Sequence, residues 1–243
     1  MGRDSAEDNL YQVVSRSLRS WLQVAREAVM RPWVQHRLQP DPSGVYQVQD
    51  AWTTDVDSTI LSEIGKIAFQ AWSEATDVPV VSRHAFVISQ LAQTRNFLVN
   101  IPDEVYNLVF EAIIDSVNGG GDIEATAAAV DDVLTWTGSP NWPGRSRNIA
   151  VTETTRAYGA GTLGAGMEQS RVTGRLLRKR WDTEKDKRVR ATHRHVDGQV
   201  LGLTELFNVG GYGILYPGDP MGPADEVCGC RCDLVIVNEE RGR

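Results

Sequence analysis

Two histidines and three cysteines near the C-terminal end of the chain could together bind a metal ion. His193 and His195 are two residues apart, and Cys228, Cys230 and Cys232 repeat at the same interval. In a strand, this spacing places alternate side chains on one side, so imidazoles and thiolates from two segments could converge on a tetrahedral zinc ion. Paired zinc ligands more commonly have two residues between the cysteines, so CxCxC is a weaker indication of zinc than CxxC.

The thiols also have interpretations without a metal. Three cysteines within five positions cannot form a disulfide framework, because a bridge between neighbours would close a strained ring and one thiol would remain. Cys230 and Cys232 could pack as small buried groups beside a terminal strand from Asp233 to Val237. A catalytic cysteine with His195 as its base is the poorer alternative, because the sequence supplies no evident orienting Asp or Asn. We therefore predict no catalytic residues, and one structural zinc as the cofactor to test.

The glycine-rich segment FNVGGYGILYPGDP (Phe207 to Pro220) lies between the histidines and the cysteines. It lacks the GxGxxG and GxxxxGK[ST] patterns that cradle phosphates, so we predict no nucleotide site here. Gly218, Asp219 and Pro220 instead favour a turn that brings strand ends together.

A dense run of basic residues precedes these motifs. Residues 171–194 hold ten Lys and Arg against three Asp and Glu, a local net charge of +7. A basic strip binds nucleic acid without reading its sequence, because neutralised phosphates release counterions. The alternative is a solvated or protein-facing surface. The residues that we expect to contact DNA are Arg171, Arg175, Arg178, Lys179, Arg180, Lys187, Arg188 and Arg190.

A long helix is expected to position these segments. Residues 145–170 favour a helix despite four glycines, and Ala157, Gly161 and Ala165 fall four apart on a face nearly free of side chains. A helix with such a face can tolerate the helix-propensity cost of about 1 kcal/mol per glycine when another backbone must approach it closely. Glu153 and Arg156 are three apart and can pair across a turn. We interpret Glu153 as structural, since no partner base or nucleophile accompanies it.

The first 140 residues read as helices without clustered catalytic residue types. A loop rich in proline is expected over residues 31–44, and Gly119, Gly120 and Gly121 should end the helix that starts near Pro102. We predict an α+β fold, with a mainly helical region over residues 1–140 and a small α+β domain over residues 141–243 in which the long helix packs on a short sheet. The segment Gly138 to Gly144 is the expected boundary. The predicted helices before it cover residues 8–30, 57–75, 82–98, 100–118 and 122–136.

Composition and charge narrow the class of protein. Of 243 residues, 41% are hydrophobic and 23% are charged, which is typical of globular proteins. No run of about 18 apolar residues exists, and the N-terminus is too polar for a signal peptide, so we expect a soluble protein with no membrane partner. Residues 1–140 have a net charge of −10 and residues 141–243 a net charge of +3, which suggests two regions with different partners.

Three motifs occur in a fixed order: IAVTETTRAYGAG (Ile149 to Gly161), then KRW with DKRVRATHRHVDGQ (Lys179 to Gln199), then YPGDP with EVCGCRC and a hydrophobic strand. Together they resemble the phage Mu F-like head-morphogenesis proteins, which are minor capsid proteins of tailed bacteriophages. Cys228-Gly229 departs from the pattern, because the family commonly has a non-cysteine followed by Asn. The family's pattern falls on Glu153, Arg156, Trp181, Asp186, Arg188, His193, Asp197, Gly198, Cys230 and Cys232.

The resemblance implies a protein present in few copies inside the phage head, near the portal, that acts in head assembly. The implied partners are the portal protein, the major capsid or scaffold protein, and double-stranded DNA without sequence specificity. The implied location is the virion interior, after assembly in the host cytoplasm. One rival hypothesis is a zinc-dependent or ADP-ribosyl-transferring enzyme built around His193, His195 and the cysteines. Another is an assembly chaperone that is absent from the finished particle.

Overall fold

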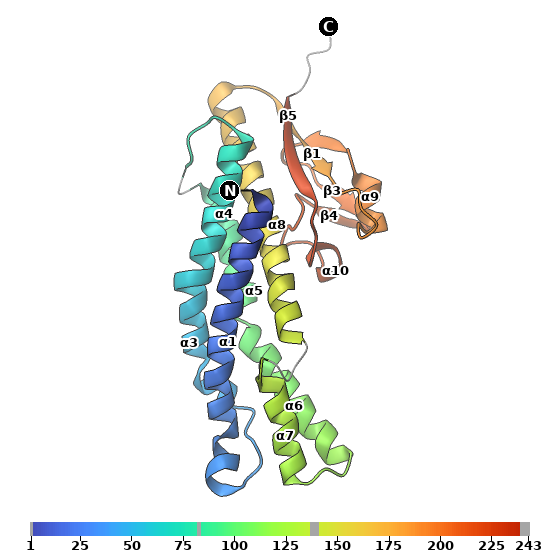
Figure 1. Cartoon of the computed structure of the whole chain (residues 1–243). Coiled ribbons are helices and arrows are strands. Elements are labelled where there is room, and N and C mark those ends of the chain that lie inside the picture. Colours follow the sequence, from blue (N-terminus) through green and yellow to red (C-terminus); the bar gives the residue numbers. More distant parts are fainter. Residues whose placement is uncertain (1, 82–83, 137–140, 239–243) are drawn as a thin grey trace. The chain divides into compact units, whose positions relative to one another are not determined.

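The computed structural model describes residues 2–81, 84–136 and 141–238 and has an α+β fold, which confirms the predicted class (Figure 1). Helices make up the N-terminal part, and the short strands all lie beyond residue 176. The helical elements are α1 (Arg3–His36), α2 (Gly44–Gln47), α3 (Gln49–Asp55), the π-helix η1 (Val56–Ile60), α4 (Leu61–Ala75), α5 (Ala85–Leu98), α6 (Ile101–Asn118), α7 (Ile123–Leu134), α8 (Asn141–Thr173), α9 (Ala191–Val196) and α10 (Ala224–Val227). The strands are β1 (Leu177–Asp182), β2 (Val200–Gly202), β3 (Phe207–Val209), β4 (Tyr212–Ile214) and β5 (Asp233–Asn238).

The chain forms two compact units, each built from separate stretches of sequence. Unit 1 comprises Met1–Tyr11, Leu61–Thr94 and Asn148–Arg243, and unit 2 comprises Gln12–Ile60 and Arg95–Arg147. Residues 137–140, on which the sequence-based boundary falls, lie outside the described residues. The division of the sequence at residue 140 therefore stays a prediction.

Unit 2 is helical, and its local signals agree with the sequence. Pro102 lies in the first turn of α6, and the Asp122 side chain caps α7 by accepting a hydrogen bond from the Ala125 backbone N–H at 2.8 Å. The buried indole of Trp52 donates to the Leu98 carbonyl at 2.7 Å. Leu98 and Pro102 thus lie on either side of the connection between α5 and α6, and Asp122 marks the start of α7.

The predicted loop over residues 31–44 begins later in the structure than the sequence predicts. The sequence predicts a loop from Arg31, but α1 continues to His36 with Pro32 inside it. A proline in a helix removes one backbone hydrogen bond, yet Val29 and Met30 are buried on the preceding turn, so core contacts hold the helix past the proline. The helix ends at His36, and the next residue, Arg37, has a left-handed φ of 54°.

Helix α8 is the centre of unit 1, and small residues let its neighbours approach. Residues 152–166 are all buried, although many of them are polar or glycine. A methyl group on Gly161 would lie 2.0 Å from the Ala68 carbonyl oxygen of α4, and one on Gly166 would lie 2.6 Å from Ile236 Cδ1 of β5. The predicted close approach of another backbone is confirmed, as is the packing of the long helix on the sheet.

Two small antiparallel sheets complete unit 1. Strand β1 lies between β2 and β5, and β3 pairs with β4 (Figure 1). Along β1, Leu177, Lys179 and Trp181 are buried, whereas Arg178 and Arg180 are partly exposed on the opposite face. This alternation separates the basic run into inward and outward side chains.

The contact between α8 and α4 generates a prediction. Gly161→Ala should lower the free energy of unfolding by about 1–3 kcal/mol, because its Cβ would overlap the backbone of Ala68 and the two helices would have to separate. The matched control is Gly65→Ala in α4, where the nearest atom to the new Cβ is Leu91 Cδ1 at 3.9 Å. Its higher helix propensity should raise stability by up to about 1 kcal/mol. Urea unfolding measures both, and a Gly161→Ala protein as stable as wild type would contradict the close approach.

Candidate functional site

A buried ion pair joins α8 to the YPGDP segment. The Arg156 guanidinium bonds both Glu153 carboxylate oxygens, at 2.7 and 2.8 Å, and its Nε donates to the Gly218 carbonyl at 2.9 Å. Thr94 of α5 donates to the same carboxylate at 3.1 Å, and both charged side chains are only 6% exposed. Burial raises the pKa of Glu153, although the Arg156 guanidinium opposes this shift. The arrangement is fully hydrogen-bonded and leaves no open face for a substrate on the carboxylate.

The YPGDP segment forms the predicted turn and is buried. The Asp219 N–H donates to the Tyr216 carbonyl at 3.0 Å, and the Asp219 carboxylate accepts from the Leu215 and Met221 N–H groups at 2.8 and 2.9 Å. Gly218 has φ +82°, and a methyl group there would lie 2.8 Å from the Arg156 backbone nitrogen. A glycine is therefore required by both the backbone conformation and the contact with α8.

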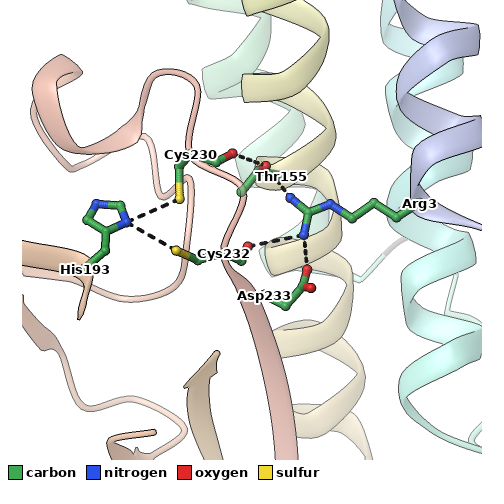
Figure 2. Close-up of polar contacts among 6 residues, drawn as sticks. All are labelled: Arg3, Thr155, His193, Cys230, Cys232 and Asp233. Atoms are coloured by element: carbon green, nitrogen blue, oxygen red, sulfur yellow. Dashed lines mark hydrogen bonds and ion pairs between the residues drawn. The ribbon is translucent and has the colours of Figure 1, made fainter. Parts of the chain in front are cut away.

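The second cluster contains His193, Cys230 and Cys232, whose possible ligand atoms all lie within 4.8 Å of one another. Figure 2 shows the His193 imidazole directed at both sulfurs, with Nδ1 3.3 Å from the Cys232 Sγ and 3.6 Å from the Cys230 Sγ. The other ring nitrogen, Nε2, lies 3.1 Å from a carboxylate oxygen of Glu226 on α10. All three members of the trio are buried, beside the ring of Trp181.

Backbone contacts fix the two thiols. The Thr155 hydroxyl of α8 donates to the Cys230 carbonyl, and the Arg3 guanidinium donates to the Cys232 carbonyl at 3.4 Å (Figure 2). Arg3 also donates to Thr155 Oγ1 at 2.6 Å and pairs with the Asp233 carboxylate. The segment that carries the thiols is thus held at the Cys230 and Cys232 carbonyls by side chains from α8 and α1.

The two thiols differ in acidity. Hydrogen bonds from Cys232 and His193 lower the pKa of the Cys230 thiol well below its ordinary value, against the effect of burial. The pKa of Cys232 is raised, chiefly because it donates to Cys230 and also because it is buried. The two buried sulfurs thus lie in different hydrogen-bonding environments, although both face the His193 imidazole.

The structure places the other two predicted ligands apart from this trio. The expectation of a strand at His193 and His195 is wrong, because both lie on the short helix α9. Residues two apart on a helix point in directions about 200° apart, so His193 is buried and His195 is exposed. Cys228 is partly exposed at the end of α10 and is not in the trio that the described residues form.

Lys179 does not lie with the exposed basic side chains among which the sequence placed it. Its side chain is buried, and its ammonium donates to the Leu203 and Leu215 carbonyls at 2.9 and 2.8 Å. Burial lowers the pKa of Lys179 to about 8, although Asp219 and Glu205 oppose the shift. An ammonium enclosed in this way is not presented to a phosphate group, so Lys179 has to be removed from the predicted DNA contacts.

The remaining basic side chains lie nearer the surface, several with partners. Arg171 pairs with Glu168 at 2.6 Å, Arg188 is 3.3 Å from Asp186, and Arg190 donates to the Cys228 carbonyl at 2.5 Å. Arg180 lies 3.7 Å from Asp182. Arg175 and Lys187 are exposed, and Arg178 is partly exposed. Ion pairing reduces the positive field of the run but leaves its charge at the surface.

Three other motif residues, Asp186, Asp197 and Gly198, also link separate segments of the chain. The Asp197 carboxylate accepts from both the N–H and the hydroxyl of Thr183, at 2.8 and 3.0 Å, and Asp186 receives two hydrogen bonds from Arg231 at 2.8 and 2.9 Å. Gly198 has φ +76°, and its N–H donates to the Trp181 carbonyl at 2.8 Å. These residues join β1, α9 and the cysteine segment.

Sequence reasoning did not identify Arg3 or Glu226 as site residues. Arg3 is 229 residues from Cys232, and Glu226 is 33 residues from His193. No local pattern marks either residue. The EVC segment that contains Glu226 was part of a motif, but its carboxylate had no assigned role.

Comparison with known proteins gives a family and two relatives. The model of the family described as "Phage Mu protein F like protein" matches residues 107–235. Minor head protein GP7 of Bacillus phage SPP1 is 34% identical over 95 residues, which are 38% of this chain and 30% of that protein. NAD(+)--arginine ADP-ribosyltransferase EFV of Enterococcus faecalis (strain ATCC 700802 / V583) is 33% identical over 89 residues, which are 37% of this chain and 18% of that protein. The chain thus matches less than a third of either relative, and no solved structure matches it.

Helix α8 carries two Glu-x-x-Arg ion pairs, so the pair of Glu168 and Arg171 can serve as a control for the buried pair of Glu153 and Arg156. Arg156→Met should lower the free energy of unfolding by about 3–5 kcal/mol, because it leaves the Glu153 carboxylate buried without its partner. Arg171→Met breaks the pair of Arg171 with Glu168, in which the arginine side chain is 71% exposed, and should lower stability by less than about 1 kcal/mol. Equal losses in urea unfolding would show that the buried pair is not a structural centre.

Proposed function

The chain belongs to the family of phage Mu protein F like proteins, and we propose that it is a minor head protein of a tailed bacteriophage that acts in head assembly. The observation that carries the proposal is the family match over residues 107–235, which includes the Glu153 and Arg156 pair, the YPGDP turn and the cysteine segment. The similarity to a phage minor head protein supports the same role. The hydrogen bonds of these motif residues support a structural role, since they join segments of unit 1.

We further propose that the protein lies inside the head and contacts the portal protein, with the major capsid or scaffold protein as a second partner. The charge distribution supports two kinds of partner, because residues 1–140 carry a net charge of −10 and residues 171–194 a net charge of +7. The acidic part would face protein, and the basic part would lie near the packaged DNA. None of the helices within the described ranges combines the length and the apolar character that a membrane span needs.

An ADP-ribosyl-transferring enzyme is the second candidate, favoured by the similarity to an ADP-ribosyltransferase. The geometry near the histidine and the cysteines gives it little support. The cavity beside His193, Cys230 and Cys232 has a volume of about 20 Å³, whereas sites for small organic ligands usually have about 300–1,000 Å³. A nicotinamide dinucleotide would not fit beside these side chains.

The location can be tested in the phage that encodes this chain. We expect the protein in purified virions by mass spectrometry, protected from external protease, and cross-linked to the portal protein when virions are treated with a short amine-reactive cross-linker. A deletion of its gene, complemented from a plasmid, is the control for its role in assembly. Presence in procapsids but absence from virions would instead identify an assembly chaperone, and digestion by external protease would contradict an interior location.

DNA contact generates a separate prediction based on the outward face of β1. Arg178→Ala with Arg180→Ala should weaken binding to double-stranded DNA, and the slope of log affinity against log salt should become shallower by about 1.8, because each phosphate contact contributes about 0.9. Arg16→Ala with Arg31→Ala removes the same charge from two exposed positions of α1 and should leave the slope unchanged. Filter binding across a salt series measures both. Failure of the wild-type protein to bind at low salt would remove DNA from the proposed partners.

A further inference from the structure

We propose that His193, Cys230 and Cys232 bind one zinc ion, with Nδ1 of the imidazole and the two thiolates as ligands and a water molecule in the fourth position. Tetrahedral zinc with Zn–S bonds of about 2.3 Å and Zn–N bonds of about 2.0 Å holds nitrogen and sulfur about 3.5 Å apart. The observed Nδ1 to Sγ distances of 3.3 and 3.6 Å bracket this value (Figure 2). Two edges of the trio therefore already have the spacing of a zinc tetrahedron, and all three ligand atoms lie within 4.8 Å of one another.

Glu226 supplies the outer contact that zinc-binding histidines usually have. Such a histidine donates its second ring N–H to a carboxylate or carbonyl, which fixes the tautomer and the orientation of the ring. Nε2 of His193 lies 3.1 Å from Glu226 Oε2, and the Thr192 hydroxyl donates to the same oxygen at 2.8 Å. With its proton on Nε2, the imidazole presents the lone pair of Nδ1 to the two sulfurs.

The charge of the proposed centre suits its surroundings. A divalent ion with two thiolates and one neutral imidazole has no net charge. This matters because the trio is buried against an apolar cluster, where an isolated charge would be unfavourable. The apolar cluster includes Trp181, Val196, Phe207, Val227 and Leu234. Thiolate and imidazole ligands in a tetrahedral arrangement favour zinc among the common divalent ions.

Space for the fourth ligand lies next to the trio. A cavity of about 20 Å³ is lined by all three proposed ligands and by Arg190, Gly229 and Arg231 among others. A cavity needs at least about 10–15 Å³ to hold one water molecule. A metal-bound water would fit there, whereas a larger ligand would not.

The ligands are held in place by contacts that do not involve the metal. Thr152 accepts from the Gly229 N–H at 2.8 Å, Thr155 donates to the Cys230 carbonyl, and Arg3 donates to the Cys232 carbonyl. The backbone of the thiol segment is therefore anchored on α8 and α1 before any ion binds. The ion would then connect this segment to α9, although His193 and Cys230 are 37 positions apart in the sequence.

The first experiment measures zinc in the full chain after removal of any affinity tag. Mass spectrometry of the metal content, after dialysis against metal-free buffer containing a reductant, should give about one zinc per chain. Cys230→Ser, Cys232→Ser and His193→Gln should each lose the ion. The matched controls are Cys228→Ser and His195→Gln, which change the same residue types outside the trio and should keep it. Absence of zinc from the wild-type protein, or its loss from either control, would overturn the assignment.

A second variant keeps the test valid if the ligand variants fail to fold. Glu226→Gln leaves all three ligands in place and should weaken zinc affinity about 10- to 100-fold at an unchanged stoichiometry, because it removes the carboxylate that orients His193. The neighbouring Asp225→Asn in the same short helix is the control, and its affinity should match wild type. Competition with a fluorescent zinc chelator measures both affinities, and equal affinities would contradict the proposed role of Glu226 and of His193 Nδ1.

Cobalt gives an independent readout of the ligand set. Co²⁺ added to the zinc-free wild-type protein should produce thiolate-to-metal charge-transfer absorption in the near ultraviolet and the strong visible bands of a tetrahedral ion. Cys228→Ser should leave the charge-transfer intensity unchanged, since only Cys230 and Cys232 are proposed as thiolate ligands. Weak visible bands typical of an octahedral ion, or a fall in intensity in Cys228→Ser, would overturn the proposed geometry.

Discussion

The buried pair of Glu153 and Arg156 is the interaction on which the rest of unit 1 depends. In this pair, two buried charged side chains of α8 neutralise each other, within a stretch of the helix (residues 152–166) that is buried throughout. It also bonds to Thr94 on α5 and to the Gly218 carbonyl of the YPGDP turn, so three remote segments meet at one point. Breaking such a pair is unfavourable because one buried charge would remain. Because residues 152–166 of α8 are buried, the helix needs glycine at the positions that α4 and β5 approach closely.

Features that depend on local spacing were predictable from the sequence. The small-residue face of α8 and the spacing of Glu153 and Arg156 both follow from 3.6 residues per turn, and both predictions are confirmed. The prediction that His193 and His195 lie in a strand is wrong, and it too rested on local spacing. A spacing of two residues has different consequences in a strand and in a helix, and six residues of α9 are too short for a periodic pattern to distinguish the two.

Features that depend on tertiary contacts were not predictable. Lys179 looks like its basic neighbours, but the alternation along β1 turns it inward, where two carbonyls receive its ammonium. Arg3 reaches the Cys232 carbonyl from the opposite end of the chain, and Glu226 reaches His193 from a short helix without a strong sequence signal. Each of these roles is set by which segments meet in space, and the pattern of a single sequence does not show this.

Several motif residues bond to the backbone of another segment, which is typical of residues that define a fold. Arg156 bonds the Gly218 carbonyl, Thr155 bonds the Cys230 carbonyl and Asp197 bonds the Thr183 N–H. A side chain used in this way determines the path of the chain and has little capacity left for a substrate. A common scaffold can therefore occur in proteins of different function, since function lies in sites added to a fold. Sequence similarity of this kind is therefore compatible with relatives that carry different functions, one a minor head protein and the other an ADP-ribosyltransferase.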